Sequence, residues 1–164
     1  MNSKENVKIA PAEGKLGILI PGMGAVATTT IAGVEAVRQG LGKPVGSLTQ
    51  LSTIRLGKRT DNNTPYIKDF VPLAGLEQLV FGGWDIYPDD AYESAVKANV
   101  LDEPLLNKLK GPLEQIKPME AVFDQDYVKR INGPNVKKGK DKFELAQAVM
   151  EDIKNFKERT GASR

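Results

Sequence analysis

A glycine-rich turn near the start of the chain has a composition suited to binding phosphate. Gly22-Met23-Gly24-Ala25 follows the apolar run Leu16 to Ile20 and precedes small residues at helical spacing. Backbone N–H groups at such a strand–turn–helix junction can bind a pyrophosphate, because glycines let the ligand approach closely. The third position of the G-x-G-x-x-G pattern is Ala27, a permitted small residue. Two interpretations stay open: a dinucleotide-binding turn, or a tight turn that only allows helix–sheet packing.

A carboxylate is expected to accompany such a turn. Dinucleotide sites hold the adenosine ribose with an acidic residue at the end of the second strand, about 20 residues further on. No acidic residue occurs between Glu35 and Asp61. Asp85 is the best candidate instead, since it comes shortly after the apolar run 79–81. The alternative is that Asp85 caps a turn or the next helix.

Three further features have structural interpretations that we prefer over functional ones. Trp84, the only tryptophan, could stack on an adenine ring, although we expect it to fill the core. The basic run 129–142 is expected to be a solvated loop rather than a phosphate or nucleic-acid site, because no aromatic residue is interleaved with it. The acid pairs at 89–90 and at 124 and 126 are expected to cap turns and helices rather than to bind a metal.

The composition excludes several kinds of chemistry. Without cysteine the chain has no disulfide, no thiol nucleophile and no thiolate metal site. Without histidine it has no Ser-His pair and no imidazole-bound metal. Any general acid or base must therefore be Asp, Glu, Lys or Tyr. Redox chemistry carried by a bound cofactor is not excluded.

Charge and hydropathy indicate where the protein works and what it does not bind. The 23 Lys and Arg nearly balance the 21 Asp and Glu, so the net charge of +2 creates no field that attracts nucleic acid. The uncharged stretch 16–34 could span a bilayer by its length, but Pro21 and the glycines interrupt it. The first 15 residues lack a signal-peptide pattern. We expect a cytoplasmic protein that binds neither nucleic acid nor membrane.

Strand and helix patterns alternate along the chain. Residues 1–14 are polar and are expected to form a flexible leader, followed by one domain over 15–164. Short apolar runs predict buried strands at 16–20, 79–81 and 121–123, and the Pro- and Gly-dense region 43–76 is expected to be rich in loops. The first helix is expected after residue 25 and should end at Gly40 or Gly42. Two more are expected over 89–100 and over 101–116, the second with a break or kink at Gly111-Pro112. The last helix is expected around 145–156 and should end near Gly161.

This alternation predicts an α/β fold with a Rossmann-like doubly wound sheet. The apolar stripe of the last helix implies a sheet face to cover and a further strand to follow it. The chain stops at Arg164 instead. We therefore expect the sheet to be incomplete because the chain ends early.

Four segments carry a more specific signal. They are Gly-Met-Gly-Ala-Val-Ala-Thr-Thr at 22–29, Gly-Ser-Leu-Thr-Gln at 46–50, Ser-Thr-Ile-Arg at 52–55 and Val-Phe-Gly-Gly-Trp-Asp-Ile at 80–86. In order and spacing the chain resembles the N-terminal part of the inositol-3-phosphate synthase (myo-inositol-1-phosphate synthase) family. The likeness continues to 152–157 and so covers nearly all of the chain from Lys15 onward.

The resemblance implies a reaction and a cofactor. The family converts glucose 6-phosphate to myo-inositol 3-phosphate by NAD-dependent oxidation, enolisation, aldol cyclisation and reduction, in inositol and phospholipid biosynthesis. Its catalytic lysines and phosphate-binding groups belong to a C-terminal portion with no counterpart before Arg164, so we assign no catalytic residue. The expectation is the NAD-binding N-terminal portion, over 15–164, of an enzyme that is a homotetramer when complete.

The resemblance also implies roles for particular residues. Gly22, Gly24, Ala25 and Val26 would hold the pyrophosphate, Asp85 and Ile86 would contact the adenosine part, and Ala121 and Val122 would form another NAD contact. Two alternatives stay open, a non-catalytic NAD-binding module and an unrelated Rossmann-type NAD(P)-dependent reductase. Charge alone does not exclude NADP, since Arg55 and Lys58 lie in a loop that the patterns do not place.

Overall fold

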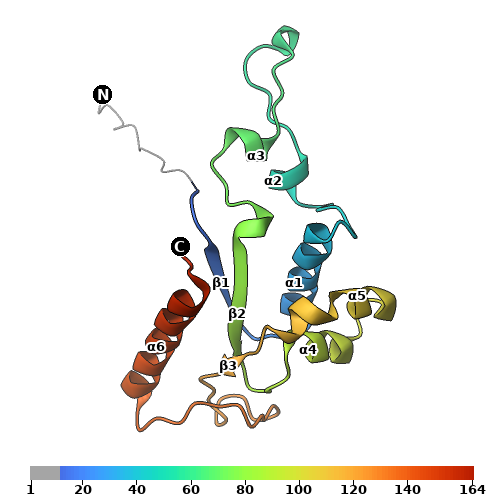
Figure 1. The fold of residues 1–164 in the computed structure, drawn as a ribbon. Coiled ribbons are helices and arrows are strands. Elements are labelled where there is room, and N and C mark those ends of the chain that lie inside the picture. Colours follow the sequence, from blue (N-terminus) through green and yellow to red (C-terminus); the bar gives the residue numbers. More distant parts are fainter. Residues whose placement is uncertain (1–11) are drawn as a thin grey trace, which may run out of the picture.

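A parallel sheet organises the part of the chain, residues 12–164, that the computed structural model describes. Within these residues the strands β1 (Leu16–Pro21), β2 (Leu79–Asp85) and β3 (Met119–Glu120) form a sheet in the order β1-β2-β3 (Figure 1). Leu16 pairs with Leu79 and Pro21 with Trp84, so β1 and β2 end at the same edge. This edge collects the segments that follow each strand.

Helices cover both faces of the sheet. α1 (Ala25–Arg38), α4 (Ala91–Ala98) and α5 (Glu103–Glu114) pack together on one face, and α6 (Lys142–Thr160) lies across the other (Figure 1). Strands followed by helices on alternate faces make a doubly wound arrangement. The predicted α/β class with a Rossmann-like sheet is confirmed.

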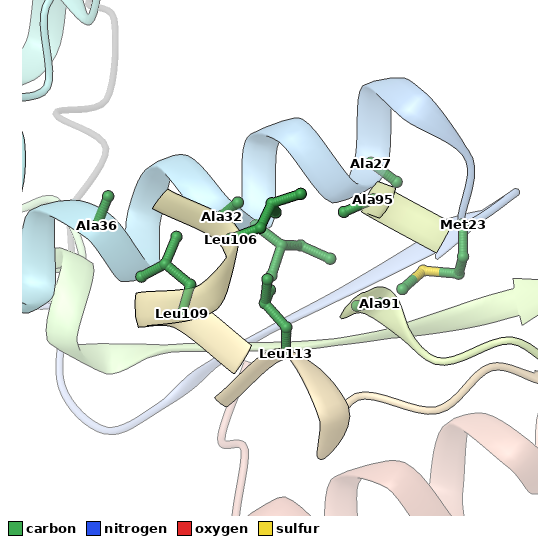
Figure 2. Packing of buried hydrophobic residues seen from close by; sticks show 10 residues of the cluster. Met23, Ala27, Ala32, Ala36, Ala91, Ala95, Leu106, Leu109 and Leu113 are labelled. Carbon is green, nitrogen blue, oxygen red and sulfur yellow. The ribbon is translucent and has the colours of Figure 1, made fainter. Parts of the chain in front are cut away.

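A cluster of buried apolar residues lies between the sheet and the three helices on the α1 face. Small residues of α1 let the helices approach closely, and Ala27, at the third position of the glycine pattern, is 4% exposed. Figure 2 shows side chains of this cluster meeting from α1, α4 and α5. Its buried members are Met23, Ala27, Ile31, Ala32, Ala36, Ala91, Ala95, Leu106, Leu109 and Leu113.

The helix ends follow the predicted signals closely. α1 ends just before Gly40, whose positive φ of 68° lets the Leu41 N–H reach the Ala36 carbonyl at 2.8 Å. Asp90 caps α4 by accepting hydrogen bonds from the N–H groups of Tyr92 and Glu93, both at 2.9 Å. The expected capping role of this acid is confirmed.

α5 is shorter than the helix predicted over 101–116, but it is not divided. Residues 103–114 form one helix with Pro112 inside it, so of the break or kink expected at Gly111-Pro112 the break is wrong. Pro112 lies in the last turn, where it removes a single backbone hydrogen bond. Leu109 and Leu113, on either side of it, are both 0% exposed. Their burial outweighs the local cost of the proline.

The glycines of β2 lie inside the strand rather than after it. A Cβ at Gly82 would lie 2.6 Å from the Phe156 ring of α6, and one at Gly83 would lie 2.1 Å from the Ile20 carbonyl oxygen. Both positions therefore require glycine for the strand to approach its neighbours. β2 thus extends to Asp85, beyond the predicted run 79–81. β3 directly precedes the run that was predicted as a strand at 121–123. Within that run, Ala121 makes only an isolated bridge to Val136.

The loop-rich region predicted over 43–76 is confirmed and extends over residues 39–78. Short helical turns occur at α2 (Leu48–Leu51), η1 (Arg59–Asp61), α3 (Ile67–Phe70) and η2 (Leu76–Gln78), and the segment projects beyond the sheet and helices (Figure 1). None of its residues is buried. Arg38 holds its returning end to α1, since the Arg38 guanidinium donates to the Leu76 carbonyl at 2.6 Å.

Residues 162–164 lie beside β1 on the edge opposite β2. Lys15 and Ala162 form a parallel bridge, and the Gly17 N–H donates to the Arg164 carbonyl at 2.7 Å. Of the predicted leader, residues 1–11 lie outside the described residues, whereas the carbonyl of Glu13 accepts a hydrogen bond from Ser163. In the described part of the chain, the helices are all too short or too polar to cross a membrane.

We predict that Gly83→Ala lowers the free energy of unfolding by about 3 kcal/mol, because the added methyl group would overlap the backbone of β1. Gly33→Ala is the matched control. Gly33 is exposed in the middle of α1, and among the described residues no packing partner lies within 4 Å of a Cβ at this position. The change to alanine should therefore stabilise the chain by up to about 1 kcal/mol. Urea denaturation of both variants measures the difference, and equal stabilities would contradict the close packing of β1 and β2.

Candidate functional site

The carboxyl edge of the sheet holds a cavity of about 590 Å³. The turn after β1, the end of β2, the segment after β3 and one residue of α6 form its walls, and we call it the edge cavity. It contains the predicted site residues Gly22, Gly24, Asp85, Ile86, Ala121 and Val122, which come from three separate segments. The full lining is Pro21, Gly22, Gly24, Trp84, Asp85, Ile86, Tyr87, Ala121, Val122, Phe123, Ile131 and Val149.

The remaining predicted residues lie on the first turn of α1. Ala25 lines a smaller neighbouring cavity of about 310 Å³, which shares Gly24 and Asp85 with the edge cavity. The Val26 side chain is 83% exposed and lines neither cavity. A role for Val26 would therefore rest on its backbone N–H group at the start of the helix.

The glycine turn leaves the start of α1 open to a ligand. Gly22 has a φ of 91°, which favours glycine, and its N–H donates to the Trp84 carbonyl at 2.7 Å. Among residues 12–164, no heavy atom outside the neighbouring residues lies within 4 Å of a Cβ built at Gly22 or Gly24. The Gly24 cap supplies no side-chain hydrogen bond, and the first turn of α1 contains no acidic residue. The backbone therefore forms an open cradle that fits an anionic group at a positive helix end.

Asp85 links the end of β2 to this turn. Its Oδ2 accepts a hydrogen bond from the Met23 N–H at 2.6 Å, and its Oδ1 accepts one from the Tyr87 N–H at 3.0 Å. The turn-capping role that the sequence left open is thus present. Each carboxylate oxygen can accept more than one hydrogen bond, so the same group can also receive a ligand hydroxyl in the cavity that it lines.

The order of the strands in the sheet explains why the acidic residue expected about 20 residues after the glycine turn is absent from that part of the sequence. β2 is the neighbour of β1, but the excursion 39–78 separates the two in sequence. Asp85 is therefore the acidic residue at the end of the second strand, in the position that dinucleotide sites use.

Trp84 and Lys137 differ from their predicted environments. Trp84 is half-buried and lines the edge cavity instead of filling the core. Its indole N–H donates to Asp152 Oδ2 at 2.7 Å, and Lys137 Nζ lies 2.8 Å from the same oxygen. The Lys137 side chain is 11% exposed, so this member of the basic run is not solvated. The difference arises because α6 supplies Asp152, a partner that is distant in sequence.

Sequence patterns missed Asn135, which ties the ends of β2 and β3 together. Its side-chain amide donates to the carbonyls of Asp85, at 2.8 Å, and Met119, at 3.3 Å. Its backbone N–H donates to the Ile86 carbonyl at 2.8 Å, and its carbonyl accepts from Ala121 at 3.0 Å. Only the turn-forming run Asn132 to Asn135 signalled this segment, and such a run does not reveal its distant partners.

An ion pair borders the smaller cavity. Asp89 Oδ2 lies 2.6 Å from Lys97 Nζ. The hydrogen bond and charge of Asp89 raise the pKa of Lys97 above its ordinary 10.5, against the opposing effect of desolvation. Asp85 and Asp89 thus border this cavity together with one lysine that already has a partner.

Residues 16–164 match the model of an NAD-binding domain family that is described as myo-inositol-1-phosphate synthase. Inositol-3-phosphate synthase 1 of Bacteroides thetaiotaomicron is 51% identical over 151 residues, which cover 92% of this chain and 34% of that protein. Inositol-3-phosphate synthase 1 of rice, Oryza sativa subsp. japonica, is 35% identical over 162 residues, covering 89% of this chain and 31% of that protein. The chain spans about a third of the length of these relatives.

A solved structure agrees with these matches. The crystal structure of inositol-3-phosphate synthase from Caenorhabditis elegans superposes with a TM-score of 0.78 at 27% sequence identity. The alignment covers 90% of this chain and 32% of that protein. The likeness therefore extends over nearly the whole sheet and its helices.

We predict that Asn135→Asp lowers the free energy of unfolding by about 2 kcal/mol at neutral pH, because a carboxylate would face two carbonyl oxygens without a proton to donate. The loss should shrink as the pH falls and the introduced carboxyl group is protonated. Asn132→Asp, at an exposed position in the same loop, is the control and should change stability by less than about 0.5 kcal/mol. Equal stabilities of the two variants at neutral pH would contradict the proposed bridge.

Proposed function

The chain belongs to the myo-inositol-1-phosphate synthase family, and we propose that the edge cavity is where its NAD-binding domain holds the dinucleotide. The observation that carries this proposal is the convergence of an uncapped helix start, two glycines open to space and a strand-end carboxylate on one cavity. Those three features are what a dinucleotide requires for its pyrophosphate and its adenosine ribose.

The pyrophosphate would lie against the glycine turn. Gly22 and Gly24 would allow close approach, and the N–H groups of Ala25 and Val26 would point toward the phosphates at the positive end of α1. The absence of acidic residues from the first turn of α1 supports this placement, since a carboxylate there would repel the ligand. The remaining predicted contacts, Ala121 and Val122, would border the dinucleotide from the segment after β3.

The adenosine part would lie beside Asp85 and Ile86. Asp85 would act twice, by holding the glycine turn through Met23 and by accepting a ribose hydroxyl. The carboxylates of Asp85 and Asp89 lie close to this position, and Lys97 is already paired with Asp89. A 2′-phosphate would meet repulsion here, which favours NAD over NADP.

The complete enzyme would convert glucose 6-phosphate to myo-inositol 3-phosphate, in inositol and phospholipid biosynthesis. Bound NAD supplies a reversible oxidation and reduction in that reaction, and the residues described here bind and orient it. The relatives named inositol-3-phosphate synthase support a sugar phosphate as substrate. We also propose that the complete enzyme is a cytoplasmic homotetramer. No residue of this chain is assigned to catalysis.

We predict that Gly24→Val weakens NAD binding at least tenfold while changing the free energy of unfolding by no more than about 1 kcal/mol. The backbone angles of Gly24, φ −80° and ψ −156°, suit any residue, and its side chain would enter the open space where the pyrophosphate would lie. Isothermal titration calorimetry with NAD and NADP measures the effect, and Gly33→Ala serves as the remote control.

Two outcomes would contradict the proposal. Unchanged NAD affinity in Gly24→Val would remove the dinucleotide from the edge cavity. Equal affinity of the unaltered chain for NAD and NADP would contradict the discrimination attributed to Asp85 and Asp89.

A further inference from the structure

We infer that Trp84 forms an aromatic wall against which the adenine ring of the dinucleotide packs, and that Asp152 is the positioning residue that fixes the indole there. This inference rests on the proposed function, because it concerns the same cavity. The hydrogen bond between the Trp84 indole N–H and Asp152 Oδ2, at 2.7 Å, is the central observation.

The pleat of β2 places Trp84 on the side of the sheet away from the apolar core. Gly82 and Trp84 lie two residues apart and therefore share a face. Phe156 of α6 covers Gly82 and is 3% exposed. Trp84 lies two residues nearer the carboxyl edge of the sheet than Gly82, beyond the contact with Phe156. It borders the edge cavity together with Val149 of α6.

Asp152 is placed by helical spacing to reach this indole. Val149, Asp152 and Phe156 are three and four residues apart, so they lie on one side of α6. Val149 contributes to the cavity wall, Phe156 packs on the sheet, and Asp152 between them accepts the indole hydrogen bond. The indole has one N–H donor, so this bond determines which edge of the ring points to the helix and which part borders the cavity.

Lys137 completes the arrangement by balancing the charge of Asp152. Its Nζ lies 2.8 Å from the oxygen that accepts the indole bond. The Lys137 N–H also donates to the Ala121 carbonyl at 2.9 Å, which ties the lysine to another segment of the cavity wall. A half-buried ion pair contributes little net stability compared with apolar packing. Its value here lies in the direction that it gives to the indole.

The ligand part that suits this wall is a planar nitrogen heterocycle. Bases pack on tryptophan faces through stacking. Trp84 directly precedes Asp85 and Ile86, beside which the adenosine part is proposed to lie, so the ring in question is the adenine rather than the nicotinamide. ADP-ribose, which contains the adenine but no nicotinamide, is therefore the appropriate probe, and nicotinamide mononucleotide is its counterpart.

The test compares two double variants that differ in a single acceptor. Both double variants carry Lys137→Met, because the lysine charge would be left unpaired once the Asp152 carboxylate is removed. Asp152→Asn then keeps an oxygen for the indole N–H, whereas the isosteric Asp152→Leu does not. We expect ADP-ribose affinity within about twofold of the unaltered chain for D152N/K137M and a roughly tenfold loss for D152L/K137M.

The fluorescence of Trp84 provides a readout that a change in stability alone would not alter. It is the only tryptophan, so intrinsic fluorescence reports its environment directly. Energy transfer from Trp84 to bound NADH should be retained in D152N/K137M and reduced at saturating NADH in D152L/K137M, because a released indole changes its orientation. Trp84→Phe keeps an aromatic ring but has no N–H for Asp152, so it should bind ADP-ribose about as weakly as D152L/K137M, and Trp84→Leu should bind it at least as weakly as Trp84→Phe. The tryptophan variants decide the question even where a double variant fails to fold.

Three outcomes would overturn the inference. Equal ADP-ribose affinity of the two folded double variants would remove Asp152 as the positioning residue. Unchanged affinity in Trp84→Leu, or a loss confined to nicotinamide mononucleotide, would remove the adenine from Trp84. In each of these cases NAD binding by the unaltered chain would leave the proposed function intact, whereas a chain that binds neither NADH nor ADP-ribose would overturn both the inference and the proposed function.

Discussion

The close contact between the glycine turn and the end of β2 is the constraint on which the site depends. The Gly22 N–H donates to the Trp84 carbonyl, and the Met23 N–H donates to the Asp85 carboxylate. Both bonds require β1 and β2 to lie side by side, which Gly83 permits by leaving room for the Ile20 carbonyl. The start of α1, the strand-end acid and the cavity wall are thereby fixed relative to one another, so a dinucleotide would meet a preorganised surface.

The two faces of the sheet are held by different interactions. On the α1 face, alanines and leucines of three helices form an apolar core against the strands. On the α6 face, Phe156 packs at Gly82, and nearer the carboxyl edge the contact passes to Trp84, Asp152 and Lys137. Apolar packing gives stability without direction, whereas hydrogen bonds orient the groups that they join. The directional contacts thus lie beside the edge cavity, where the orientation of side chains matters for a ligand.

Asp85 and Asn135 show how the carboxyl edge is kept in one conformation. Asp85 supplies acceptors to two backbone N–H groups, and Asn135 supplies donors to the carbonyls of Asp85 and Met119. The pairing of donors with acceptors explains why a carboxylate stands at one position and an amide at the other. It also gives Asp85 a structural role in addition to its proposed contact with the cofactor, so its substitution would affect the turn as well as that contact.

The sequence by itself determined the local elements and the family. The first strand, the glycine turn and the helix that ends just before Gly40 follow from residues within a few positions of one another, as do the cap at Asp90 and the end of the last helix just before Gly161. Local patterns failed where distant segments meet. The sequence predicts Asp85 as a site residue but does not place its strand beside β1, because the excursion 39–78 separates the two strands in sequence. Buried leucines keep α5 intact through Pro112, and the Trp84 indole bonds to Asp152, which is 68 residues away. Propensities and caps record energies between near neighbours, but strand order and the partners of half-buried polar groups are decided only when the whole chain packs.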